Sequence, residues 1–146
     1  MDTNHETKKL FMYAILCLSL AVGLSSGVFS NYFKDVFAVD SVQRGLLEIP
    51  RETPGILCVV ILTALSGLGN LSLMVMAYGF CTLGLAVLGL LSPSYFIMQI
   101  FLFSFSLGEH MMMPLRDSIA MDLSGEGKTG TFLGHAVITP ATKIGD

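Results

Sequence analysis

Apolar residues fill two long blocks of the chain that contain no ionisable side chain. Residues 10–33 and residues 53–108 lack Asp, Glu, Lys, Arg and His altogether. An α-helix needs about 20 mainly apolar residues to cross the hydrocarbon core of a bilayer. We therefore expect one span in the first block and two to three spans in the second. A soluble chain could not cover its surface with so few polar groups.

Polar and turn-forming residues divide the blocks into helices. A polar connection at residues 31–40, a Gly-rich turn at residues 67–70 and the sequence Ser92-Pro93-Ser94 are the expected breaks. They predict four transmembrane helices, at about residues 10–32, 41–69, 71–91 and 95–119. Residues 122–130 are expected to form a loop, and residues 131–146 the start of an incomplete fifth helix. The predicted fold is an all-α polytopic membrane helix bundle, with residues 1–146 as one membrane domain.

Composition agrees with this interpretation and excludes several others. Hydrophobic residues make up 53% of the 146 residues and charged residues 13%, whereas soluble domains carry about 25% charged residues. No basic stripe is present, so we expect no nucleic-acid partner. Cys17, Cys58 and Cys81 all lie in apolar runs, which indicates free buried thiols and not a disulfide framework or a metal site.

The first apolar run is interpreted as a retained span. Lys8 and Lys9 precede it as the basic region of a signal peptide would, but the run is longer than the 7–15 residues typical of a signal-peptide core. Lys8 and Lys9 lie before the first helix, and Lys128 and Lys143 lie after the fourth. By the positive-inside rule we expect the N-terminus in the cytoplasm and the chain in the cytoplasmic (plasma) membrane.

Small residues recur along the first helix. Ser19, Gly23 and Gly27 are spaced four residues apart and share one helical face. Small residues let membrane helices approach closely. We therefore expect this face to pack against another helix.

The second predicted helix carries charge at its beginning. Its uncharged apolar run, Gly55 to Gly69, spans only about 22 Å, too short for a core of about 30 Å. The helix must include preceding residues, and the sequence Asp40-Ser41-Val42-Gln43 resembles a capping box at its start. Four charged residues of alternating sign then share one face about 100° wide, and two prolines are expected to kink the helix. The charged residues are Arg44, Glu48, Arg51 and Glu52, and the prolines are Pro50 and Pro54.

The fourth helix shows the same pattern. Its uncharged run from Tyr95 to Leu107 is too short to span, so the helix must continue through Glu109 and His110 toward Arg116 and Asp117. Ionisable groups at membrane depth cost about 2.5–3.5 kcal/mol each by insertion scales, and they usually face a polar cavity or the bundle interior.

These charges suggest a polar pathway for a substrate or a coupling ion. Its candidate residues are Glu48, Arg51, Glu52, Glu109 and His110. Two other interpretations stay open: the charges form ion pairs that hold helices together, or the charges of the second helix lie among lipid headgroups. For Arg116 and Asp117 we expect a salt bridge at the membrane boundary.

No enzyme signature is present in the sequence. It contains no Walker loop, no Gly-x-Ser-x-Gly and no His-Glu-x-x-His. The run from His110 to Met113 offers copper-binding side chains, but consecutive residues of a helix point in different directions and cannot converge on one ion. We therefore expect no enzyme activity, no cofactor and no metal site.

The order of these features resembles the N-terminal part of a major facilitator superfamily transporter. The resemblance runs from the first helix to about Gly134 and rests on Gln43-Arg44-Gly45, on Gly108 followed by Pro114, and on the stretches Asp122-Leu123 and Lys128 to Gly134. Two departures are clear. The turn Ser66 to Ser72 lacks the basic residues of the family signature, and Ser104 stands where proton antiporters carry an arginine.

The resemblance implies twelve helices in two halves with a solute bound between them. The chain would then be a fragment of a secondary transporter that moves a small solute by alternating access, and it would be inactive alone. Its partners would be the lipid bilayer, the solute, and the missing second half or copies of itself. Two alternatives stay open: a complete small four-helix protein that transports as an oligomer, and a partner subunit that does not transport.

Overall fold

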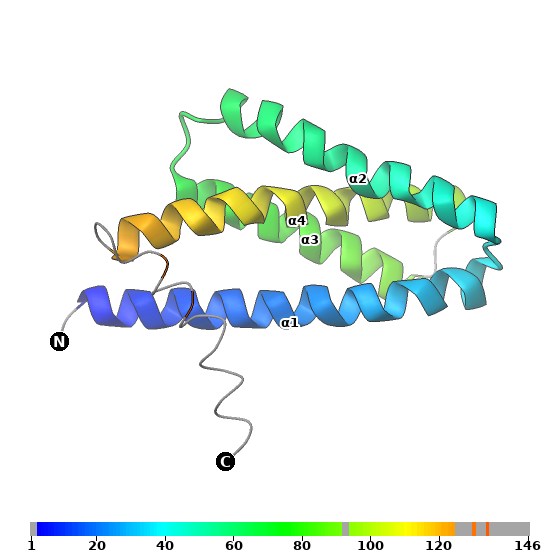
Figure 1. The fold of residues 1–146 in the computed structure, drawn as a ribbon, viewed down its shortest axis with the longest axis horizontal. Coiled ribbons are helices and arrows are strands. Elements are labelled where there is room, and N and C mark those ends of the chain that lie inside the picture. The colour runs from blue at the N-terminus through cyan, green and yellow to red at the C-terminus, as the bar shows by residue number, and fades with distance from the viewer. Residues whose placement is uncertain (1–2, 92–93, 125–129, 131–133, 135–146) are drawn as a thin grey trace, which may run out of the picture. The chain divides into compact units, whose positions relative to one another are not determined.

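The computed structural model describes residues 3–91, 94–124, 130 and 134. These residues contain four α-helices. These are α1 (Thr3–Phe37), α2 (Ser41–Ala64), α3 (Asn70–Leu90) and α4 (Tyr95–Ser124) (Figure 1). The chain forms two compact units. Residues 1–27 and 116–146 make one unit, and residues 28–115 make the other. The second unit, called the inner unit below, contains the end of α1, all of α2 and α3, and most of α4.

The helices differ from the predicted ones mainly at their ends. α1 begins earlier than residue 10 and includes an ion pair between Lys9 Nζ and Glu6 Oε1, 3.4 Å apart. α2 ends at Ala64 and not at residue 69, because the chain turns through Ser66, Gly67 and Leu68 before α3 begins. α4 continues past residue 119 to Ser124. The incomplete fifth helix expected at residues 131–146 lies outside the described residues, apart from Gly134.

Three helical segments are long and apolar enough to cross a membrane, namely Glu6–Phe37, Asn70–Leu90 and Tyr95–Ser124. They indicate a membrane protein, as the two uncharged blocks predicted. The prediction of four spans is met only in part, because α2 is not among these segments. Glu48, Arg51 and Glu52 interrupt the apolar character of its first half.

The start of α2 confirms the predicted capping box. The Asp40 carboxylate accepts a hydrogen bond from the Gln43 backbone N–H (2.8 Å), and the Asp40 N–H donates to Gln43 Oε1 (3.1 Å). This exchange satisfies two backbone donors at the exposed end of the helix. Ala38, two residues before Asp40, has φ 51°, a left-handed conformation that turns the chain between α1 and α2.

Asp40→Ala should lower the free energy of unfolding by about 1 kcal/mol, because it removes the side-chain acceptor of the cap. The measurement is thermal or denaturant unfolding in detergent, followed by circular dichroism. Asp35→Ala is the matched control, since Asp35 is exposed in the last turns of α1 and caps nothing. Equal losses in the two variants would contradict the assigned role of Asp40.

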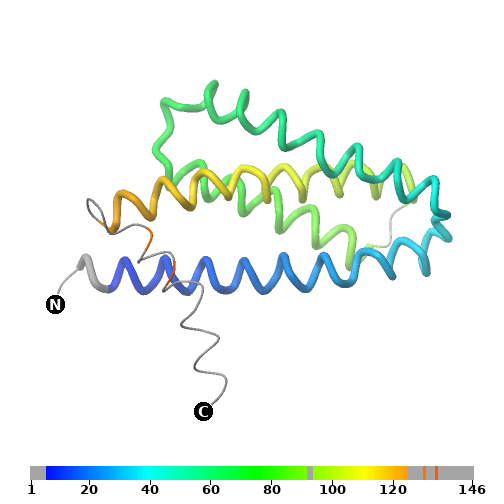
Figure 2. Tube along the Cα trace, in the orientation of Figure 1, coloured from blue at the N-terminus to red at the C-terminus, as the bar shows by residue number. Residues whose placement is uncertain are grey.

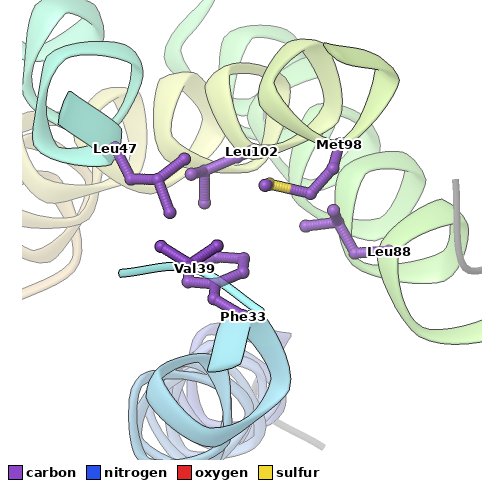
Figure 3. Packing of buried hydrophobic residues seen from close by; sticks show 6 residues of the cluster. All are labelled: Phe33, Val39, Leu47, Leu88, Met98 and Leu102. Atoms are coloured by element: carbon purple, nitrogen blue, oxygen red, sulfur yellow. The ribbon is translucent and has the colours of Figure 1, made fainter. Parts of the chain in front are cut away.

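The hydrophobic core of the inner unit lies where the end of α1, the start of α2, the end of α3 and the start of α4 meet. Its six residues come from all four helices and the α1–α2 connection, and Figure 3 shows their side chains facing one another. They are Phe33, Val39, Leu47, Leu88, Met98 and Leu102. This core is called the end cluster below. Five aromatic residues surround it, and one of them, Phe29, is stacked on Phe33 with ring centroids 5.5 Å apart.

α3 and α4 pack backbone to backbone in the inner unit. An added Cβ at Gly84 would lie 2.7 Å from the backbone of Phe101 and Phe105, and one at Gly108 would overlap the carbonyl oxygen of Ala77. Cys81 Sγ donates to the Phe105 carbonyl (3.3 Å), and Ser104 Oγ donates to the Phe80 carbonyl (3.3 Å). Each helix therefore donates one hydrogen bond to the backbone of the other.

Candidate functional site

The charged face of α2 is intact in the folded chain. Arg44, Glu48, Arg51 and Glu52 are all exposed on a single continuous helix, although Pro50 and Pro54 lie within it. At about 100° per residue, Gly55 falls on the same face, one turn beyond Glu52. The buried residues Leu47, Pro54 and Cys58 mark the neighbouring face, which packs into the inner unit.

Ser106 of α4 joins this face to α4. Its side chain is buried, and its Oγ donates a hydrogen bond to the backbone carbonyl of Arg51. The carbonyls of Leu46 and Pro50 lack their usual helical donors, because the residues four positions later are prolines with no N–H. The hydroxyl of Ser106 thus bonds to α2 between two weakened turns.

His110 meets the same face one turn further along α4. An added Cβ at Gly55 would lie 3.2 Å from Cε1 and 3.3 Å from Nδ1 of His110. The imidazole edge that carries both nitrogens therefore rests against a residue with no side chain. Any larger residue at position 55 would push the ring away.

Glu109 lies on the side of α4 that also carries Leu102 and Ser106, at helical spacings of seven and three residues. It is half-buried. Glu109 is therefore one helical turn along α4 from Ser106, whose hydroxyl bonds to the Arg51 carbonyl.

These residues of two neighbouring helices are called the polar zone below. Its α2 members are Glu48, Arg51, Glu52 and Gly55, and its α4 members are Ser106, Glu109 and His110. All of them belong to the inner unit. The structure brings the two charged segments, which lie about 55 residues apart in the chain, together at two points: the Ser106 hydrogen bond to the Arg51 carbonyl, and His110 beside Gly55.

The ionic contacts in the polar zone are incomplete. Arg51 Nη1 lies 3.4 Å from Glu48 Oε1, with side chains 47% and 52% exposed. Such an exposed pair stabilises a helix only weakly. Within the described part of the chain, neither Glu52 nor Glu109 has an ion-pair partner, and His110 has no hydrogen bond. The polar zone therefore keeps groups that are able to bind a solute, an ion or water.

The other predicted residues lie in the outer unit of residues 1–27 and 116–146. Arg116 Nη2 is 2.9 Å from Asp117 Oδ1, which gives the predicted pair a short contact, while its place at a membrane boundary stays a prediction. Ser19, Gly23 and Gly27 are exposed, and an added Cβ at either glycine would meet no atom within 4 Å. Their packing against another helix also stays a prediction.

The sulfur and imidazole groups of α4 do not converge in the structure. Met111 and Met112 are buried, whereas Met113 is 50% exposed. Among the described residues, no group of three His, Cys, Asp or Glu side chains is arranged to hold a metal ion. Cys58 and Cys81 are buried free thiols, as the sequence predicted, but Cys17 is exposed.

Sequence reasoning missed two members of the polar zone, Ser106 and Gly55. Each carried a signal. Ser106 stands one turn before the Glu109–His110 pair, and Gly55 stands one turn beyond the charged residues on the same face of α2. Neither signal reveals that the two helices face each other.

Comparison with known proteins finds no family model, no curated protein and no solved structure that matches the chain.

Proposed function

We propose that the polar zone lines the path of a small solute through a membrane, and that the chain is part of a secondary transporter. The observation that supports this most directly is the contact of His110 with Gly55, at the end of the charged face of α2. It brings an ionisable residue of α4 against the face of α2 that carries Glu48, Arg51 and Glu52. Ionisable groups at membrane depth are costly and are usually retained for transport or proton relay.

α2 is the fourth span in this proposal. It is 24 residues long, which corresponds to about 36 Å, and it runs beside α4 in the inner unit (Figure 2). A charged helix crosses a bilayer when its polar face lies against protein or a water-filled cavity. The Ser106 hydrogen bond and the His110 contact supply part of this protein cover.

The major facilitator resemblance supports the same proposal. In such a transporter the rest of the protein would cover the exposed side of the polar zone and complete the solute path. The chain then contributes one wall of the path and carries no transport by itself.

Water should reach the polar zone, and this can be tested without knowing the solute. In a chain free of native cysteines, Glu52→Cys and Glu109→Cys should react with a membrane-impermeant methanethiosulfonate at least about tenfold faster than lipid-facing positions, because only a hydrated thiol ionises readily. Val60→Cys on α2 and Ile100→Cys on α4 are the controls, since both residues are exposed and apolar. The chain is reconstituted in liposomes. Equal rates at all four positions would refute a water-filled path.

The half-exposed Glu48–Arg51 pair also favours a second function, in which the charged face of α2 binds a partner subunit and no solute crosses. A measurement of solute flux distinguishes this partner-subunit function from a complete oligomeric transporter. Liposomes that contain only this chain are loaded with a panel of labelled amino acids, sugars and organic cations. Flux that Glu109→Gln abolishes would establish an oligomeric transporter, whereas hydrated cysteines without flux agree with one wall of a larger path.

A further inference from the structure

The first half of α2 is held firmly in the inner unit. The capping box fixes its first turn, and Leu47 is buried in the end cluster. Arg44 donates from Nη1 to Ser30 Oγ (2.9 Å) and from Nη2 to the Ser30 carbonyl (3.1 Å), which ties α2 to the end of α1. Ser106 holds the Arg51 carbonyl further along.

The second half of α2 makes few contacts with the rest of the inner unit. Cys58 is the last buried residue of the helix, and every residue from 59 to 64 is exposed or half-exposed. Figure 1 shows the C-terminal end of α2 standing apart from α3 and α4. Beyond Pro54, α2 packs against its neighbours through Gly55, beside His110, and through the buried Cys58, and its later residues are at most partly covered.

Two prolines separate the held half from the loose half. Pro50 and Pro54 each remove one backbone hydrogen bond of the helix, and each ring crowds the carbonyl four residues before it. Helices bend at such positions. The turn after α2 contains Gly67 and Gly69, where an added Cβ would meet no neighbour within 4 Å, so no other part of the described structure packs closely against the turn at these positions.

The α3–α4 pair offers the opposite case. Gly84 and Gly108 bring the two backbones into direct contact, and Cys81 and Ser104 donate hydrogen bonds across it. Separation of these helices would break both hydrogen bonds and a large close-packed surface. The two helices should therefore stay together when α2 moves.

We propose that the C-terminal half of α2, Gly55 to Ala64, is a movable gate. It bends away from the rigid α3–α4 pair at Pro50–Pro54, and the contact of Gly55 with His110 is its closed position. Opening uncovers the imidazole and admits water or solute to the α4 residues of the polar zone. The role as a gate rests on the proposed function, but the movement itself does not.

Two native cysteines report on the two interfaces separately. Cys58 lies on the inner side of α2 and is 7% exposed, and Cys81 lies between α3 and α4 and is 6% exposed. Each thiol also donates to a backbone carbonyl, that of Gly55 for Cys58 and that of Phe105 for Cys81. They are therefore closely matched in exposure, but the Cys58 hydrogen bond stays within α2, whereas that of Cys81 crosses from α3 to α4.

The experiment follows alkylation of both cysteines by N-ethylmaleimide in liposomes, in the full chain with Cys17→Ser. Each rate is divided by the rate of the same cysteine in the SDS-unfolded chain, so that it reports the fraction of time the site is open. We expect the normalised rate of Cys58 to exceed that of Cys81 at least about tenfold. Equal rates, a faster Cys81, or protection of both cysteines would overturn the gate.

A second measurement uses Gly55→Ala. The added methyl group would lie 3.2 Å from Cε1 of His110, and it should raise the Cys58 rate several-fold while the Cys81 rate stays unchanged. Gly45→Ala is the control, because position 45 of α2 has open space around it. An unchanged Cys58 rate would overturn Gly55 as the closing contact, and the wild-type comparison remains decisive if the variant does not fold. If Cys58 reacts faster than Cys81 but Glu52→Cys and Glu109→Cys react no faster than their controls, the proposed solute path is refuted and the gate is not.

Discussion

Gly108→Ala should weaken the folded chain more than any other single methyl addition. The new Cβ would overlap the carbonyl oxygen of Ala77 and lie 2.8 Å from the backbone nitrogen and the sulfur of Cys81. Two of these atoms belong to the backbone of α3, so no side-chain rotation relieves the overlap, and α3 and α4 must move apart. We expect a loss of about 3 kcal/mol in the free energy of unfolding, at the upper end for overpacking.

The measurement is unfolding of the purified chain in mixed micelles by added SDS, followed by circular dichroism. Gly79→Ala on α3 is the matched control, because an added Cβ there meets no atom within 4 Å. Alanine favours a helix over glycine, so this control should gain up to about 1 kcal/mol. If Gly108→Ala proved as stable as Gly79→Ala, the close α3–α4 packing would be wrong.

Leu102→Ala should produce the second largest loss, because it opens a cavity in the end cluster. Leu102 is 1% exposed and packs beside Leu47, Leu88 and Met98, from three helices (Figure 3). Lipid is as apolar as this core, so the transfer part of the usual cost is absent and the lost packing remains. We expect about 2 kcal/mol, near the lower end for buried leucine truncation.

Leu90→Ala is the control for this substitution, because Leu90 is 82% exposed on α3. The same change of residue at a lipid-facing position should cost little. The same SDS titration serves both variants. If Leu90→Ala lowered the free energy of unfolding as much as Leu102→Ala, packing in the end cluster would not be what stabilises the folded chain.

The number and order of the helices could be predicted because membrane segments carry a strong local signal. Two uncharged blocks and three polar breaks define four helices, and Asp40 with Gln43 marks the start of one of them. The end of α2 was less accessible to prediction. Leu65 and Leu68 continue the apolar pattern, and the chain leaves the helix there because Ser66, Gly67 and Gly69 favour a turn.

The candidate site was predictable in its residues but not in its contacts. Charge within an apolar helix singles out Glu52, Glu109 and His110 from sequence alone. That His110 rests on Gly55 depends on the rotation of two helices about their axes, which no local pattern encodes. The close approach of α3 and α4 at Gly84 and Gly108 could not be predicted for a related reason. α3 is uniformly apolar, so its sequence does not show which side meets α4.

The placement of the contacts along α4 bears on the bilayer in which the chain can fold. The hydrogen bonds and close approaches from α4 to α2 and α3 lie between residues 101 and 110, a band of about 14 Å. Together with the end cluster they leave the C-terminal end of α2 lightly held, whereas the start of α3 stays packed through Leu73 and Met74. A change of a few Å in membrane thickness can then be absorbed by tilting of the free helix ends. The same band of contacts should therefore persist in thin and thick membranes.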